Sequence, residues 1–157
     1  QGGMPALGDN PLFLGCADYR STIASNGESS GFTFPEEMRR HADKGTALVT
    51  DKDPGDAEIA EVVSQAAAHS CIVLGTYNGH ILQGQLRLAK ALAATGLPMI
   101  LVALRNPYDL RNMPDHVAAL AGWEYTRPLF DALWPVLNGT VRPTGKLPLL
   151  TLTKAAK

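Results

Sequence analysis

Residues 71–104 read CIVLGTYNGHILQGQLRLAKALAATGLPMILVAL, two short apolar runs with an amphipathic segment between them. The runs Cys71–Gly75 and Met99–Leu104 show no polar alternation, which is typical of strands covered on both faces. The segment between them ends at Thr95-Gly96, with a glycine where a helix C-cap favours one. Its apolar residues recur at helical spacing, at Leu82, Leu86, Ala89 and Ala93. The stretch therefore predicts two buried strands joined by a helix.

The same alternation extends outward in both directions. Further apolar runs predict strands at Leu12–Gly15, Thr46–Thr50 and Val117–Ala121. A short polar helix is expected at about Pro35–Asp43. Two more amphipathic stripes comprise Ile59, Val62, Val63, Ala66 and Ala67, and then Leu129, Leu133, Val136 and Leu137 before Asn138-Gly139.

Proline marks the first and last of these stripes. Asp53-Pro54 predicts that the Asp53 carboxylate caps a helix whose first position is Pro54. Pro135 falls inside the last stripe, where a missing hydrogen bond and a clash with the preceding turn predict a bend.

Strand–helix alternation with buried strands predicts an α/β fold. We expect a three-layer sandwich with a mostly parallel, doubly wound sheet of five to six strands in the order 2-1-3-4-5 and helices on both faces. Ser21–Thr33 is interpreted as a long exposed loop, and Asn138–Lys157 as an extended tail with a short edge strand. Residues 12–149 are predicted to form one domain, with residues 1–11 as an N-terminal tail or cloning scar and residues 150–157 as a C-terminal tail.

Composition and charge limit the classes of partner and the environments that fit this chain. The 157 residues carry a net charge of −1, which argues against nucleic acid, because binding phosphates needs a basic excess. The longest apolar stretch is far too short to span a membrane, and no secretory start is visible, so the compartment stays open. Cys16 and Cys71 are expected at opposite ends of neighbouring strands, too far apart for a disulfide.

Polar side chains gather where ligands bind in such a fold, just after the strands. All four tyrosines follow predicted strands, each with polar neighbours. Their rings either pack among their own loops, dock another domain or bind a small ligand such as a sugar. Asp109 and Glu124 are possible acid/base carboxylates, but the spacing does not establish that they converge. The candidate binding or interface residues are Asp18, Tyr19, Arg20, Tyr77, Asn78, Arg105, Asn106, Tyr108, Asp109, Glu124 and Tyr125.

Other motif classes are not found. Gly75–Gly79 lacks the pattern of a phosphate-binding loop, and no nucleophile elbow is present. The four histidines His41, His69, His80 and His116 are scattered, which predicts no metal site. Cys16 is interpreted as a buried thiol, and no cofactor is expected.

Five sequence motifs, in their order along the chain, resemble motifs of the C-terminal α/β-sandwich domain of glycoside hydrolase family 3, in particular of its β-N-acetylhexosaminidase branch. The similarity covers about Leu12 to Leu149, nearly the whole chain, and departs from the family pattern at Gly139-Thr140 and Pro135. The motifs are Ile72–Asn78 (IVLGTYN), Gln83–Leu86 (QGQL), Leu104–Leu110 (LRNPYDL), Glu124–Thr126 (EYT) and Pro143–Pro148 (PTGKLP).

The resemblance implies an accessory domain of a retaining hydrolase that releases N-acetylglucosamine-type sugars from a glycan. In that family the nucleophile, and in this branch the acid/base histidine loop, lie on an N-terminal (β/α)8 barrel, so no catalytic residue is assigned here. The barrel is the implied partner, and this domain is expected to buttress it, to line its cleft and to be inactive alone. Some branches place an acid/base carboxylate on this domain, but the surroundings of Glu28 do not match.

Two rival functions remain open from the residues alone. The first is an autonomous carbohydrate- or small-ligand-binding module that uses the tyrosine-bearing strand ends. The second is a flavodoxin-like binding protein for a nucleotide or flavin, which the missing phosphate loop disfavours.

Overall fold

A parallel sheet forms the centre of the computed structural model, which describes residues 3–17, 31–111 and 113–145. Its strands are β1 (Pro11–Cys16), β2 (Thr46–Thr50), β3 (Cys71–Thr76), β4 (Met99–Ala103) and β5 (Ala118–Ala121). They lie in the order β2-β1-β3-β4-β5, and every neighbouring pair is parallel. The predicted strands and their order are confirmed.

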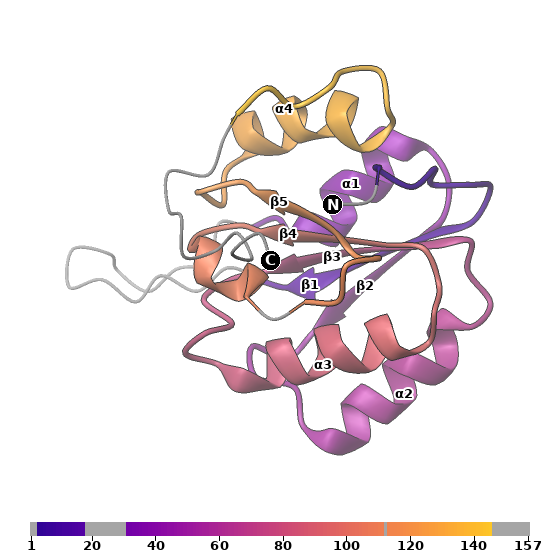
Figure 1. Ribbon diagram of the computed structural model, residues 1–157, viewed down its shortest axis with the longest axis vertical. Helices are drawn as coiled ribbons and strands as arrows, with labels where there is room; N and C mark the ends of the chain where they lie inside the picture. The colour runs from indigo at the N-terminus through magenta and orange to yellow at the C-terminus, as the bar shows by residue number, and fades with distance from the viewer. Residues whose placement is uncertain (1–2, 18–30, 112, 146–157) are drawn as a thin grey trace, which may run out of the picture.

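Helices cover both faces of the sheet, which confirms the three-layer sandwich (Figure 1). On one face lie α1 (Phe34–Ala42) and α4 (Arg127–Leu137). On the other lie α2 (Asp56–Ala66) and α3 (Gln83–Ala94). A short 3-10 helix, η1 (Pro107–Leu110), follows β4.

Each face of the sheet has its own apolar core, because successive strand residues point to opposite sides. Phe13 of β1 belongs to the cluster that contains Phe130 of α4. The next residue, Leu14, belongs to the opposite cluster with Leu88 of α3. All four side chains are buried, as expected for strands that are covered on both faces.

The prediction that Asp53 caps the second helix is wrong. That helix begins at Asp56, its N-cap is Gly55, and no side chain caps it. Asp53 Oδ1 instead accepts a hydrogen bond of 2.6 Å from the backbone N–H of Gly84 in the first turn of α3. The N-cap residue of α3, Leu82, has no side-chain acceptor, so the carboxylate of a neighbouring loop satisfies this helix end.

The three predicted apolar stripes face the sheet, with differences at their ends. In α2 Val62 and Ala66 are buried, whereas Ala67 lies just beyond the helix as its C-cap. In α3 Ala89 and Ala93 are buried as predicted, but the stripe passes through Leu88 and Leu92 and leaves Leu82 and Leu86 half-buried. In α4 the buried side chains are Phe130, Leu133 and Leu137.

Several other predictions concern the ends and loops. Pro135 lies inside α4 as predicted, and the bend there stays a prediction. Most of the predicted loop 21–33 and the end of the tail lie outside the described residues, and the described part of the tail, residues 138–145, contains no strand.

Cys16 and Cys71 are free, and the register places Cys71 opposite Pro11, at the other end of β1 from Cys16. Within the described ranges no helix has the length and apolar character that crossing a bilayer requires.

Candidate functional site at the carboxyl edge

The loops that leave the carboxyl ends of the strands form one edge of the sheet, which we call the carboxyl edge. It comprises residues 51–55 after β2, 77–82 after β3, 104–111 after β4 and 122–126 after β5. In doubly wound sheets this is the edge where ligands bind. Asp18, Tyr19 and Arg20 follow β1 but lie outside the described residues, so their role stays a prediction.

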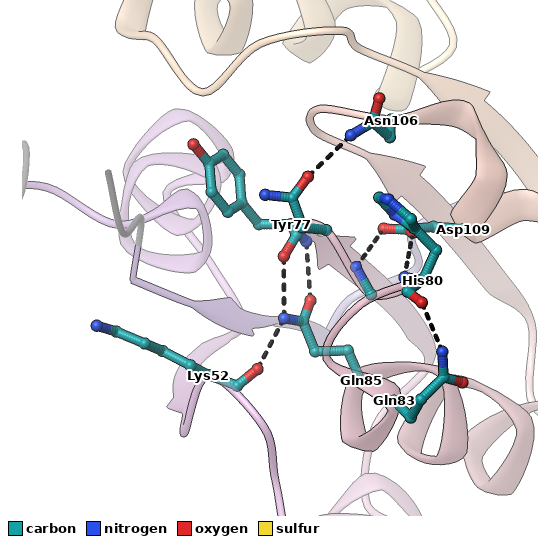
Figure 2. Close-up of polar contacts among 9 residues, drawn as sticks. Lys52, Tyr77, His80, Gln83, Gln85, Asn106 and Asp109 are labelled. Carbon is teal, nitrogen blue, oxygen red and sulfur yellow. Dashed lines mark hydrogen bonds and ion pairs between the residues drawn. The ribbon is translucent and has the colours of Figure 1, made fainter. Parts of the chain in front are cut away.

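A buried glutamine connects two of these loops. Gln85 of α3 accepts a hydrogen bond of 2.8 Å from the backbone N–H of Tyr77, and its amide donates to the Tyr77 carbonyl at 3.1 Å (Figure 2). The same amide donates to the Lys52 carbonyl at 2.8 Å. Because the side chain is almost fully buried, these bonds replace its contacts with water and fix the ends of β2 and β3 relative to each other.

A buried carboxylate holds the turn that follows. Asp109 of η1 is fully buried and accepts hydrogen bonds from the backbone N–H groups of Gly79 at 2.9 Å and His80 at 2.7 Å. It also lies 3.1 Å from Nδ1 of the His80 ring (Figure 2). The turn starts at Asn78, whose φ of 57° is left-handed, a conformation that asparagine tolerates better than most residues. Asp109 therefore acts as the anchor of the 78–80 turn.

The structure does not bring Asp109 and Glu124 together as a pair of accessible carboxylates. Asp109 is fully buried among its donors, whereas Glu124 is exposed. Glycoside hydrolysis by two carboxyl groups needs both of them at the scissile bond. The buried position of Asp109 therefore argues for a structural role for this residue.

Two further bonds join the loops after β3 and β4. The Asn106 side-chain amide donates to Asn78 Oδ1 at 2.9 Å (Figure 2). Arg105 Nη1 donates to the Tyr77 hydroxyl at 2.6 Å, and its guanidinium lies 5.5 Å from the centroid of the Tyr77 ring. With Gln85, these contacts make the neighbouring loops of the carboxyl edge one braced unit.

Two of the tyrosines pack inside the edge. Tyr77 is buried, and its ring meets that of Tyr125 edge to face with centroids 5.5 Å apart. The Tyr125 hydroxyl accepts from the backbone N–H of Phe34 at 2.7 Å and donates to the Cys16 carbonyl at 3.1 Å. The interpretation that these rings pack among their own loops therefore fits Tyr77 and Tyr125.

Apart from these two packed tyrosines, the carboxyl edge has three exposed side chains with large apolar surfaces. Ile81, which follows β3, is 66% exposed. Trp123, which follows β5, is 49% exposed, and Tyr108, which follows β4, is 41% exposed. The guanidinium of Arg111 covers Tyr108 at 5.1 Å from the ring centroid. Sequence analysis selected Tyr108 but missed Ile81 and Trp123, although both stand in polar loops directly after apolar runs.

Gln85 was also missed as a candidate. A polar residue within the apolar stripe of a helix is a signal that could have found it, because such a residue needs partners when it is buried. Among the described residues no group of three or more His, Cys, Asp and Glu side chains is placed to hold a metal ion.

Comparison with solved structures confirms the predicted resemblance to a domain of glycoside hydrolase family 3. The chain superposes, with a TM-score of 0.78 and 25% sequence identity, on a glycoside hydrolase family 3 β-N-acetylglucosaminidase from Paenibacillus sp. str. FPU-7. The match covers 98% of this chain but only 30% of that enzyme. No family model and no curated protein matches the sequence.

A second solved structure shares the fold. It is a fungal multi-domain GH3 β-N-acetylglucosaminidase with a GCN5-related glucosamine N-acetyltransferase region. The TM-score is 0.68 and the sequence identity 18%, and the match covers 92% of this chain and 16% of that one. At this identity the likeness concerns the fold alone. The chain spans less than a third of the length of either enzyme.

Proposed function

We propose that this chain is the accessory domain of a retaining glycoside hydrolase of the β-N-acetylglucosaminidase type. It buttresses a catalytic (β/α)8 barrel of the parent polypeptide and lines one side of the cleft with its carboxyl edge. The observation that carries this proposal is the unequal coverage of the Paenibacillus enzyme. Nearly all of this chain superposes on less than a third of that protein, so such an enzyme has most of its mass outside this fold.

The arrangement of the edge supports a docking role. Gln85, Asp109 and Asn106 hold three neighbouring loops through hydrogen bonds, so the loops need little further ordering when a partner binds. Ile81 and Tyr108 project from this braced unit as exposed apolar groups. Apolar and aromatic anchors on a rigid, polar surface are typical of the centre of protein interfaces.

The proposal predicts no hydrolysis by the isolated chain, because the nucleophile and the general acid belong to the barrel. Purified chain is incubated with a chromogenic N-acetylglucosaminide, and no turnover above the buffer rate is expected. Turnover that disappears on mutation of Asp109, Glu124 or Glu28 would contradict the proposal.

A domain replacement tests the accessory role directly. In the Paenibacillus enzyme, the segment that superposes on this chain is replaced by residues 12–149, and a second variant lacks the segment altogether. We expect the chimaera to keep measurable β-N-acetylglucosaminidase activity and the truncated enzyme to lose it or to unfold at lower temperature. Equal loss in both proteins would overturn the accessory role.

Ile81→Asp in the chimaera sharpens this test. A buried, unpaired carboxylate at an interface is costly, so docking should weaken and activity fall. The matched change Val49→Asp alters an exposed side chain of β2 and should leave the activity of the chimaera intact.

An autonomous carbohydrate-binding module is the second candidate function. The observation that favours it is an exposed indole beside an exposed carboxylate, Trp123 and Glu124, at the same edge. Saccharide binding by a chain that fails to support activity in the chimaera would favour this alternative.

A further inference from the structure

Trp123 has a backbone conformation that bulky residues rarely adopt. Its φ is +72°, in the left-handed region that glycine enters without cost. The side chain is nevertheless a tryptophan, and 49% of it is exposed. Glycine would satisfy this turn without strain, so the turn alone does not explain the indole. Residues held in strained conformations cluster at ligand-binding sites.

The chain is anchored on both sides of Trp123. On one side, the Gly122 N–H donates to the Ala103 carbonyl at 2.8 Å, and a Cβ at Gly122 would lie 2.9 Å from Leu129 Cδ2. On the other side, the Tyr125 hydroxyl is bonded to the backbone of β1 and α1. The two residues between these anchors, Trp123 and Glu124, are therefore presented by a fixed backbone.

Neither side chain is occupied within the described part of the chain. No aromatic ring or guanidinium group there stacks on the Trp123 indole, and no hydrogen bond or ion pair there engages the Glu124 carboxylate. Beyond the half-buried Tyr125 and Thr126, the first two residues of α4, Arg127 and Pro128, are exposed as well. The exposed indole therefore has an exposed charged neighbour, Glu124, in its own loop.

We propose that Trp123 and Glu124 form a binding site for a saccharide that contains β-linked N-acetylglucosamine. The ligand class rests on the proposed function. The indole offers a flat apolar face to the C–H face of the sugar ring, and the carboxylate accepts hydrogen bonds from a hydroxyl or the acetamido N–H. An aromatic surface with a polar group beside it in the chain offers both kinds of contact that a sugar ring makes.

The polar surroundings favour a saccharide over a protein partner at this position. A protein contact of high affinity surrounds its central tryptophan with groups that exclude water. Here an exposed carboxylate is the next residue, and removing it from water against an apolar partner would be costly. A sugar hydroxyl or amide instead replaces the lost water contacts by direct hydrogen bonds.

Intrinsic fluorescence tests the site in the chain as it stands. The chain has two tryptophans, and the other, Trp134, stacks on His41 in the interface between α1 and α4. In the Trp134→Phe variant Trp123 is therefore the sole tryptophan. Titration with the β-1,4-linked tetramer of N-acetylglucosamine is expected to give a saturable change in its emission.

Variants then assign the signal to the two residues. By backbone-amide NMR, Trp123→Gly should lose the binding while its other resonances show an intact fold. Glu124→Gln should weaken it roughly tenfold, because one charge-assisted hydrogen bond becomes a neutral one. The matched control is Val141→Ser, since Val141 is also 49% exposed but lies beyond α4, and it should bind like the unmodified chain.

Three results would overturn the proposal. They are a titration without saturable change, full binding by Trp123→Gly, and equal binding of the corresponding tetramer of glucose, which would contradict the ligand class. Loss of chimaera activity on Trp123→Gly without any saccharide binding by the isolated chain would identify a protein contact instead. An inactive chimaera with normal saccharide binding would contradict the accessory role and leave this site standing.

Discussion

The two carboxylates Asp109 and Glu124 lie at the same edge of the sheet and have opposite surroundings. Asp109 is fully buried and bound by two backbone N–H groups and a histidine ring. Glu124 is exposed and follows a strained tryptophan. The comparison teaches that position at the carboxyl edge does not make a residue functional. A polar group whose bonds are satisfied by the fold maintains the edge, whereas an exposed one, hydrated and without a partner among the described residues, is available to a ligand.

The same contrast holds between the aromatic residues of the edge. Tyr125 lies two residues after Trp123, yet it packs between Tyr77 and Phe130 and bonds to the backbone of two other elements. Trp123 has half of its surface in water. The region braced by Gln85 and Asp109 and the region around Trp123 therefore differ in what mutations should do.

The largest expected effect is that of removing the buried carboxylate. Asp109→Ala leaves the N–H groups of Gly79 and His80 without acceptors, and we expect the free energy of unfolding to fall by about 3 kcal/mol. Urea denaturation measures it. Glu124→Ala, the matched change in the exposed region, should alter stability by no more than about 0.5 kcal/mol. Equal losses in the two variants would break the comparison.

The amino end of β3 shows what burial does to an ionisable group, the thiol of Cys71, which donates a long bond of 3.8 Å to the Ile72 carbonyl. Cys71 is fully buried, and this burial raises the pKa of its thiol from 9.0 to about 11. Between these two pKa values the unfolded chain loses the thiol proton and the folded chain keeps it, so stability falls as pH rises from about 9 to about 11. Two pKa units correspond to a full loss of about 2.7 kcal/mol.

Unfolding free energies at several pH values between about 8 and 11 measure this slope. Cys71→Val removes the titrating group and should remove the corresponding part of the slope, whatever it does to the absolute stability. A slope unchanged by the substitution would mean that other groups cause it.

The third prediction concerns the buried glutamine. Gln85→Leu leaves the N–H of Tyr77 without its acceptor in a buried position, and we expect a loss of about 2 kcal/mol in unfolding free energy. Gln83 is the matched control on the same helix, because the residue is exposed and, within the described part of the chain, its amide bonds only to the His80 carbonyl. A larger loss for Gln83→Leu than for Gln85→Leu would show that the glutamine bridge does not brace the loops.

The strands of the sheet could be predicted from the sequence, because buried parallel strands have a local pattern of continuous apolar residues. Runs such as Cys71–Gly75 and Met99–Leu104 are continuously apolar, and crossover rules then limit the strand order. The second helix began two residues later than predicted, because Asp53 satisfies the first turn of α3 instead of its own helix. Such a bond between distant residues leaves no local signal.

The site was predictable in its position but only partly in its members. Tyr77 and Tyr125 stand after strands like Tyr108, and only packing with residues far away in the sequence separates these two packed rings from the exposed one. The left-handed backbone of Trp123 had no signal either, because tryptophan is among the residues least expected there. The sequence therefore predicted which residues lie at the carboxyl edge, but not whether each side chain there is packed or exposed.

The smallest expected effect separates the strain of Trp123 from the loss of its ring. Both Trp123→Gly and Trp123→Ala remove the indole, but only glycine adopts a φ of +72° freely, so the Gly variant should be more stable than the Ala variant by about 1 kcal/mol. At Glu124, where φ is not positive, the order should reverse, because glycine gains more freedom on unfolding. Urea denaturation of the four variants measures both differences. An Ala variant at position 123 at least as stable as the Gly variant would mean that the backbone there is unstrained, which would remove the first argument for a saccharide site at Trp123.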